Sequence, residues 1–416
     1  FYELCDRYGL MVIDEMNLES HGLWDRIRWQ GIGVEDAVPG DKPEWLPALL
    51  DRAANMVERD KNHPSIVMWS CGNESFGGTN ILAVADWFRA HDSRPVHYEG
   101  VHWDPRYPQT TDVTSQMYTP AAEVEAYLAT HRDKPFILCE YAHAMGNSFG
   151  AVDRYLDLAY REPLFQGGFI WDFADQAIRL VDRYGRQYFG YGGDCGEAPH
   201  DGDFSANGIL FADHTPKPFL QEVRHVYQPF RIAISREGFE VENRLLFTSS
   251  AAYECVVTLA REGEVLHEQV IETGVAPGVT GTYALPFGLP LGPGEVTVGV
   301  VFRLRAATIW APVGHTVASE QAVFSEPPAQ HPPLVGLVET PRAPELVEGI
   351  HNVGVRGTHF SALFSRLYGG LVSYRYGGTP ESGRELLRGI PQPNFWHAPT
   401  SNERGWGAPF TDGQWL

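Results

Sequence analysis

The first 228 residues alternate short apolar runs with longer amphipathic stretches, and this alternation limits the possible folds more than any other feature. Six runs have the length of strands, are rich in β-branched or aromatic residues, and finish on polar residues: 10–15, 65–74, 94–100, 111–118, 134–140 and 167–172. Strands that alternate with helices predict a parallel sheet with crossover helices, whose functional residues gather where the strands end.

The stretch between the first two runs carries the clearest helical pattern. Residues 41–60 place apolar side chains at 46, 49, 50, 53 and 57, which is the spacing of one helical face. Asp41 and Glu44 have the spacing of a capping box, with Pro43 between them. We therefore predict a helix here that packs on the sheet.

Six such strands predict most of a (β/α)8 TIM barrel over residues 1–228, with the first two barrel strands absent from the sequence. The chain opens on FYELCDRYGL, without an initiating Met and inside an amphipathic helical pattern. We therefore expect a piece of a longer protein, whose missing start could have included a signal peptide.

The pattern changes after residue 228. Residues 229–330 contain short alternating runs with Gly or Pro turns, which predict an immunoglobulin-like β-sandwich. SEPPAQHPP at 325–333 reads as a Pro-rich linker, and residues 331–416 read as the start of another β-rich domain. A chain of 416 residues is expected to form two or three domains.

Charge and cysteine content narrow the class of partner. The 32 Lys and Arg residues against 53 Asp and Glu residues give a net charge of −21, which disfavours nucleic acid or an anionic membrane as partner. No apolar run reaches the roughly 18 residues that a membrane helix needs. Five cysteines without disulfide or zinc spacing favour reduced thiols and a cytoplasmic protein.

Two glutamates, Glu74 in WSCGNES and Glu140 in ILCEYAHAMGN, end apolar runs. Retaining glycosidases need two carboxyl groups about 5–5.5 Å apart, one as nucleophile and one as acid/base, and neighbouring strand ends can supply them. Asn73 could bind the sugar hydroxyl beside the anomeric carbon. A carboxylate paired with an Arg at a strand end is the structural alternative for either residue.

The acidic run IDEMNLESHG at 13–22 follows another strand and contains Asp14, Glu15, Asn17, Glu19 and His21. Oxygen ligands with one imidazole suit Mg²⁺ or Mn²⁺ better than zinc, although a solvated acidic loop explains the run equally well.

Tyr118 and Trp171 stand at strand ends, where they could stack on the apolar face of a sugar, whereas most other aromatic residues belong to the core. The Gly- and Asp-rich stretch 191–208 could rim the site or simply connect elements.

Five segments together resemble the large β-galactosidases of glycoside hydrolase family 2: LCDRYGLMVIDEMNLESHG, RDKNHPSIVMWSCGNES, ILCEYAHAMGNS, GGFIWDFADQ and NGILFADHTPKP. The resemblance implies that residues 229–330 are the family's fourth domain and that 331–416 begin its fifth, a larger galactose-mutarotase-like β-sandwich. FWHAPTSNERGWG resembles a run of that fifth domain, with Ser401 and Glu403 where Asp is common.

The resemblance also implies roles for individual residues. Glu74 would be the acid/base and Glu140 the nucleophile, at the ends of the fourth and seventh barrel strands. Glu19, His21 and Glu74 would hold Mg²⁺, and the Phe204 carbonyl with Asn207 would hold Na⁺. The remaining expected substrate contacts are Asn73 at the 2-hydroxyl, Tyr118 near the nucleophile, His143 at the galactose and Trp171 as the sugar platform.

The expected activity is retaining hydrolysis of terminal non-reducing β-D-galactose from lactose and other β-galactosides. We expect the complete protein to be a homo-oligomer and this chain alone to be inactive or nearly so. A β-glucuronidase or β-mannosidase of the same family is the nearest alternative. A non-catalytic carbohydrate-binding protein and a metal-dependent barrel lyase centred on residues 13–22 are the alternatives from other classes.

Overall fold

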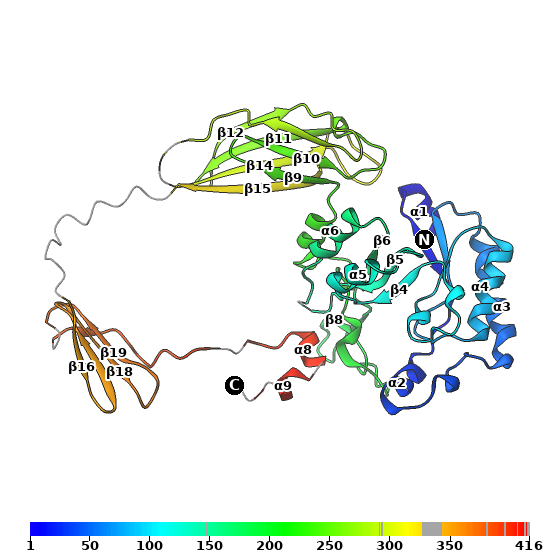
Figure 1. Cartoon of the computed structure of the whole chain (residues 1–416), viewed down its shortest axis with the longest axis horizontal. Helices are drawn as coiled ribbons and strands as arrows, with labels where there is room; N and C mark the ends of the chain where they lie inside the picture. The colour runs from blue at the N-terminus through cyan, green and yellow to red at the C-terminus, as the bar shows by residue number, and fades with distance from the viewer. Residues whose placement is uncertain are drawn as a thin grey trace.

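The computed structural model describes residues 1–416 except 147, 291, 293, 327–342, 380–381, 395–396, 406, 412 and 414–416. Along the described chain, a region of parallel strands and helices is followed by two antiparallel β regions (Figure 1). No helix in the described part of the chain has both the length and the apolar character needed to cross a membrane.

The first region contains the six expected parallel strands. They are β1 (Val12–Glu15), β2 (Ile66–Ser70), β3 (Val96–His97), β4 (Thr114–Met117), β5 (Phe136–Tyr141) and β6 (Phe165–Ile170). They pair in chain order as two three-stranded parallel sheets, β1-β2-β3 and β4-β5-β6. Among the described strands, β1 and β3 are the outer strands of the first sheet, and β4 and β6 are the outer strands of the second.

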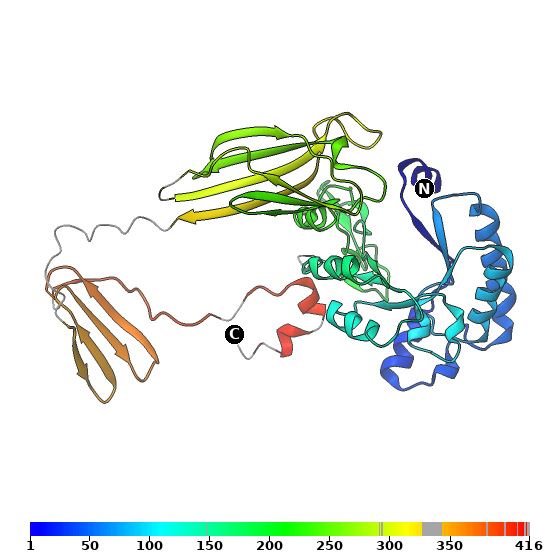
Figure 2. The same ribbon diagram turned by 45° about the horizontal axis from the view of Figure 1, so that its top comes forward.

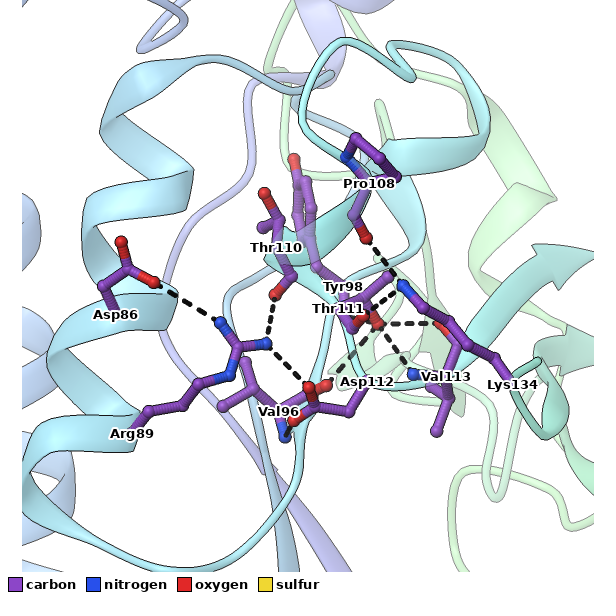
Figure 3. A network of polar contacts seen from close by, with 10 residues as sticks. All are labelled: Asp86, Arg89, Val96, Tyr98, Pro108, Thr110, Thr111, Asp112, Val113 and Lys134. Carbon is purple, nitrogen blue, oxygen red and sulfur yellow. Dashed lines mark hydrogen bonds and ion pairs between the residues drawn. The ribbon is translucent and has the colours of Figure 1, made fainter.

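Side-chain oxygens join the two sheets between β3 and β4. Asp112 accepts a hydrogen bond from the Val96 N–H at 2.7 Å, and Thr111 Oγ1 accepts one from the Tyr98 N–H at 3.2 Å (Figure 3). The Asp112 N–H in turn donates to the Val96 carbonyl at 2.8 Å. Because side chains satisfy backbone groups that a strand ladder would use, β3 has only two residues where a longer strand is expected.

Seven helices belong to this region: α1 (Tyr2–Tyr8), α2 (His21–Gln30), α3 (Leu46–Asp60), α4 (Thr79–His91), α5 (Ala121–Leu128), α6 (Asp153–Arg161) and α7 (Leu220–Val226). Helices α3 and α4 lie side by side on the outer side of β1–β3 in both ribbon views (Figures 1 and 2). The predicted apolar face of α3 is buried there, with Leu49, Ala53 and Val57 packed in one core with Trp69 of β2. The predicted helix is confirmed.

The predicted capping box is wrong. Helix α3 is preceded by the short 3-10 helix η2 (Pro43–Trp45), which has no side-chain cap. Asp41 accepts a hydrogen bond at 2.7 Å from the N–H of Thr79, the first residue of α4, and forms an ion pair with Arg106 at 2.6 Å. Asp41 therefore caps the N-terminus of α4 and not that of α3, because its carboxylate binds the Thr79 N–H in place of an N–H of α3.

Short elements complete this region: the 3-10 helices η1 (Val34–Asp36), η3 (Glu99–His102), η4 (Pro108–Thr110) and η5 (Gly202–Ser205), and the hairpin β7 (Ile178–Val181) with β8 (Gln187–Gly190). Helix η3 follows β3 directly, and η5 lies in the predicted Gly- and Asp-rich stretch. Helix η5 contains Phe204, one of the predicted sodium ligands.

The second region is a β-sandwich, as predicted. Its strands are β9 (Phe230–Ile234), β10 (Gly238–Asn243), β11 (Tyr253–Arg261), β12 (Glu264–Ile271), β13 (Thr280–Ala284), β14 (Gly294–Leu304) and β15 (Thr316–Glu326), with the 3-10 helix η6 (Ser250–Ala252) before β11. They form the antiparallel sheets β13-β10-β9 and β12-β11-β14-β15. Inward-facing Phe230, Phe239, Val257 and Phe302 form its core.

The third region is a single antiparallel sheet in chain order: β16 (Glu345–Glu348), β17 (Asn352–Arg356), β18 (Phe360–Ser365), β19 (Gly370–Tyr376) and β20 (Arg384–Glu385). Two short helices follow, α8 (Ser401–Gly405) and α9 (Ala408–Thr411). Most of the predicted linker, residues 327–333, lies outside the described residues. The domain boundaries at 228 and 330 remain predictions.

Candidate active site

A loop after β2, residues 71–78, carries the first predicted catalytic glutamate. Glu74 lies four residues beyond the end of β2 at Ser70 and not at a strand end as expected. Its φ of 40° and the φ of 54° at Phe76 lie in the left-handed region, which non-glycine residues rarely adopt. Gly72 is needed here, since its φ is 132° and a Cβ would approach Leu18 to 2.7 Å. The loop is therefore strained, a feature that clusters at functional sites.

The acidic run 13–22 divides between two roles. Asp14 is buried and accepts a hydrogen bond from the Tyr2 hydroxyl at 2.7 Å, and Glu15 accepts one from the Ser70 hydroxyl at 2.7 Å. Glu19 and His21 come from the following turn and the start of α2, and they lie beside Glu74. Only this second pair can belong to the predicted metal site.

Glu19, His21 and Glu74 form a compact group of possible ligands. Their ligand atoms all lie within 4.8 Å of one another. His21 Nδ1 contacts Glu74 Oε2 directly and lies 3.5 Å from Glu19 Oε1. The Asn73 N–H donates to the Leu18 carbonyl at 2.9 Å, which fixes the Glu74 loop against this turn. Two carboxylates and one imidazole fit a hard divalent cation.

The second predicted catalytic glutamate lies in β5. The Tyr118 hydroxyl donates a hydrogen bond of 2.5 Å to Glu140 Oε2, and the Tyr118 N–H donates to the Glu140 carbonyl at 2.9 Å. Tyr118 follows β4 with a φ of 54°, so it too adopts a left-handed backbone. Tyr118 thus holds the ends of β4 and β5 together through two hydrogen bonds to Glu140, one from its N–H and one from its hydroxyl.

Burial and neighbouring charges shift the pKa values of both glutamates. Burial raises the pKa of Glu140 to about 7, the Tyr118 hydroxyl opposes this rise, and the charge of Glu74 adds to it. Burial also raises the pKa of Glu74, although the adjacent His21 lowers it. An acid catalyst requires a raised pKa, and a nucleophile must be ionised. Glu74 beside His21 and Glu140 beside Tyr118 have different electrostatic surroundings, as acid and nucleophilic roles in one site require.

A line of rings extends from Tyr118. The ring centroids of Tyr118 and His143 lie 5.9 Å apart, and those of His143 and Phe204 lie 5.6 Å apart. Burial lowers the pKa of His143, which favours its neutral form. Trp171 follows β6 and is tied in by hydrogen bonds from its N–H to the Tyr141 carbonyl and from the Ala144 N–H to its own carbonyl.

Asn207 has one polar atom without a partner. Its side-chain Nδ2 donates to the Phe204 carbonyl at 3.0 Å, and its main-chain carbonyl accepts from the Asp172 N–H at 2.7 Å. Its Oδ1 atom is buried without a hydrogen-bond partner, in a residue that is 3% exposed. Since buried carbonyl oxygens are normally satisfied, this oxygen and the neighbouring Phe204 carbonyl fit a monovalent cation.

Comparison with known proteins places this geometry in a family. The profile described as "Glycosyl hydrolases family 2, TIM barrel domain" matches residues 1–232, more than half of the chain. The chain belongs to glycoside hydrolase family 2. A second profile, "Beta-galactosidase, domain 4", matches residues 239–325, which contain most of the β-sandwich.

Family-2 relatives match the whole chain. "Beta-galactosidase" of Halalkalibacterium halodurans is 43% identical over 100% of this chain and 40% of its own length. "Beta-galactosidase" of Streptococcus thermophilus is 40% identical over 100% of this chain and 41% of its own length. "Beta-galactosidase" of Clostridium acetobutylicum is 39% identical over 100% of this chain and 45% of its own length. The chain therefore spans about two fifths of the length of these relatives.

The structure of this family-2 barrel adds a residue that the sequence analysis missed. Glu99, in η3 just after β3, is 1% exposed and accepts a hydrogen bond from the Glu74 N–H at 2.7 Å. A signal was present, since RPVHYEG is an apolar run that finishes near a Glu, as the runs before Glu74 and Glu140 do. Strand ends alone therefore point to three glutamates.

The hydrogen bond from Tyr118 predicts a pH effect in the family-2 site. Tyr118→Phe removes a donor to the ionised form of Glu140, so the pKa of Glu140 rises further above its ordinary value. In the predicted role of nucleophile Glu140 must be ionised, so the acid limb of kcat/KM measured on the complete protein should move to higher pH by roughly one unit. An unmoved or acid-shifted limb in the pH–rate profile would contradict this assignment.

Proposed function

We propose that the complete protein is a retaining β-galactosidase, which hydrolyses terminal non-reducing β-D-galactose residues from lactose and other β-galactosides. The observation that carries the proposal is the pair Glu74, in the loop after β2, and Glu140, in β5: two partly buried carboxyls of a family-2 barrel, close enough that the charge of Glu74 raises the pKa of Glu140. The relatives that match the whole chain are named β-galactosidases, which favours galactose over other sugars.

The proposed reaction has two displacements. In the first, a Glu140 oxygen attacks the anomeric carbon while the Glu74 carboxyl gives its proton to the glycosidic oxygen, and the aglycone leaves as an alcohol. In the second, the Glu74 carboxylate takes a proton from water, whose oxygen displaces Glu140 from the anomeric carbon. Galactose leaves with its original anomeric configuration, and both carboxyls return to their first states.

The surrounding residues would orient the sugar. Asn73 adjoins Glu74 and is proposed to bind the 2-hydroxyl, where a hydrogen bond strengthens as charge develops in the transition state. Neutral His143, beside Tyr118, is proposed to bind another galactose hydroxyl. Trp171 is proposed to form the platform for the apolar face of the sugar.

Two cations are proposed as cofactors. Glu19, His21 and Glu74 would hold Mg²⁺, for which Mn²⁺ could substitute, and the bound cation would lower the pKa of Glu74 and orient its carboxyl. The Phe204 carbonyl and Asn207 Oδ1 would hold Na⁺. The Phe204 ring contacts His143, so an ordered Phe204 would in turn position a proposed substrate contact.

Removal of the divalent cation should weaken the complete enzyme without abolishing its activity. The chelator takes away a charge that tunes Glu74, but both glutamates remain in place. Titration of the chelated enzyme with Mg²⁺ should restore the rate and give a saturable binding isotherm in calorimetry, and Glu19→Gln should weaken that binding. Total loss of activity on chelation would instead favour the metal-dependent lyase alternative.

A substrate panel on the complete protein tests the proposed specificity. Aryl β-galactosides should be hydrolysed at least about 100-fold faster, in kcat/KM, than the matching β-glucuronides and β-mannosides, since hydroxyl recognition can discriminate by that much or more. A preference for either of the other sugars would favour the alternative family-2 activities. Binding of β-galactosides without turnover would favour the non-catalytic alternative.

We also propose domain types for residues 229–330 and 331–416 and a cellular location for the complete protein. A sandwich of three plus four antiparallel strands supports an immunoglobulin-like fourth domain. The sheet β16–β20 is proposed to be one part of a galactose-mutarotase-like fifth domain. The five cysteines are all free of disulfides, which supports a cytoplasmic location for the complete protein.

A further inference from the structure

Two consecutive residues after β3 hold the backbone of the loop that carries Glu74. The Glu99 carboxylate accepts a hydrogen bond of 2.7 Å from the Glu74 N–H. The Tyr98 hydroxyl donates a hydrogen bond to the Phe76 carbonyl. Glu74 and Phe76 are the two non-glycine residues of this loop with a left-handed φ, so each strained residue is bound by one member of the pair.

Tyr98 and Glu99 are themselves fixed in place. Both side chains are almost completely buried, at 0% and 1% exposed. The Tyr98 N–H is bound by Thr111 Oγ1, and the Lys134 ammonium binds the Thr111 carbonyl at 2.7 Å in the network that joins β3 to β4 (Figure 3). Gly100 leaves room for the Tyr98 ring, since a Cβ there would lie 2.5 Å from it.

Glu99 is an unusual choice for a purely structural contact. Its Oε1 atom makes the bond to the Glu74 N–H, whereas its Oε2 atom is buried without a hydrogen-bond partner. A buried carboxylate with one unsatisfied oxygen is unfavourable for folding. The contact nevertheless gives the N–H of the partly buried Glu74 an acceptor, and leaving that N–H unpaired would be costly, so the bond fixes the Glu74 backbone.

We propose that Tyr98 and Glu99 are positioning residues for proton transfer by Glu74: they hold its strained backbone so that the carboxyl meets the glycosidic oxygen. The inference rests on the proposed function, in which Glu74 is the acid/base. Neither residue is assigned contact with the substrate. They act through the loop 71–78, where a displacement of about 1 Å at the acid can cost on the order of 100-fold in rate.

Leaving-group dependence in the complete enzyme separates positioning of the acid from a general structural role. An alkyl β-galactoside needs protonation of its leaving oxygen, whereas a 2,4-dinitrophenyl β-galactoside leaves as a stable phenolate without it. The ratio kcat/KM reports only the steps up to cleavage of the glycosidic bond. A fault in positioning Glu74 must therefore appear mainly with the alkyl substrate.

We expect Glu99→Ala to lower kcat/KM about 100-fold for the alkyl galactoside and less than about 10-fold for the dinitrophenyl galactoside. Glu99→Gln keeps an oxygen that can accept from the Glu74 N–H, so it should recover most of the alkyl rate. Tyr98→Phe preserves the buried ring and loses only the hydroxyl, and it should show the same substrate bias at roughly 10-fold.

Ser115→Ala is the matched control, because Ser115 bonds His97 at 2.7 Å in the same buried region, whereas Tyr98 and Glu99 bond the loop itself. Ser115→Ala should change kcat/KM for the alkyl and the dinitrophenyl galactoside by the same factor. Equal losses on the two substrates in Glu99→Ala, or in Tyr98→Phe if Glu99→Ala does not fold, would overturn the inference. So would a folded Glu99→Gln as impaired as Glu99→Ala. If the unmodified enzyme cleaves neither galactoside, the proposed function fails instead.

Discussion

Glu140→Gln in the complete enzyme should lower kcat for aryl β-galactosides by at least about 10⁴-fold, since losing a covalent nucleophile removes the pathway it opens. The amide oxygen can still accept the hydrogen bond from Tyr118, so the local structure should persist. The largest kinetic effect in this protein should therefore accompany an intact fold. Steady-state kinetics and circular dichroism on the same preparation measure both.

The stability of Glu140→Gln provides an independent control. Burial raises the pKa of Glu140 in the folded state to about 7, above its ordinary value, so the stability contributed by the protonated group is lost as pH rises through about 7. An uncharged Gln avoids this loss. At pH 8 the variant should unfold at the same or a higher temperature than the unmodified enzyme. An active Glu140→Gln, or an inactive one that is unfolded, would remove the support for a nucleophile here.

Glu74→Gln should give the second-largest effect, and it should depend on the substrate. Loss of a positioned general acid costs about 10²–10⁴-fold where the leaving group needs a proton, which applies to lactose and alkyl galactosides. The kcat/KM for a dinitrophenyl galactoside should fall far less. Because Glu74 also belongs to the proposed Mg²⁺ site, the variant should bind Mg²⁺ more weakly in calorimetry.

The comparison between the two glutamates is itself a test. Glu140→Gln should impair all galactosides alike, because every substrate passes through the nucleophile. Glu74→Gln should discriminate between them by leaving group. If the two variants showed the reverse pattern, the roles of Glu74 and Glu140 would have to be exchanged.

The strand ends were readable from sequence because buried parallel strands are apolar runs followed abruptly by polar residues. That rule located Glu140, which lies in β5, and it located Glu74 to within four residues. It could not reveal the left-handed backbone at Glu74, because φ at a non-glycine residue depends on tertiary bonds such as the one to Glu99. Glu99 follows the strand-end rule as well, but its bond to the Glu74 N–H is a tertiary contact that only the structure shows.

Predictions from short sequence patterns failed where residues distant in the sequence bind the same hydrogen-bonding groups. Asp41 has capping-box spacing, but its oxygens bind Thr79 and Arg106 from other elements. The Val96 N–H would serve a longer β3, but the Asp112 side chain takes it. In both cases the competing residue is more than ten positions away, beyond any short sequence pattern. The apolar face of α3 depends on local periodicity, and four of its five predicted positions pack in the core: Leu49, Leu50, Ala53 and Val57.

The most direct test of the central claim, that Glu74 and Glu140 cleave a glycosidic bond by double displacement, is the configuration of the first-formed galactose. Proton NMR of an aryl β-galactoside during hydrolysis by the complete enzyme resolves the anomers before mutarotation mixes them. Initial release of β-galactose is the predicted result, because two inversions restore the starting configuration. Initial release of α-galactose would mean a single displacement and would contradict the assignment of Glu140 as nucleophile.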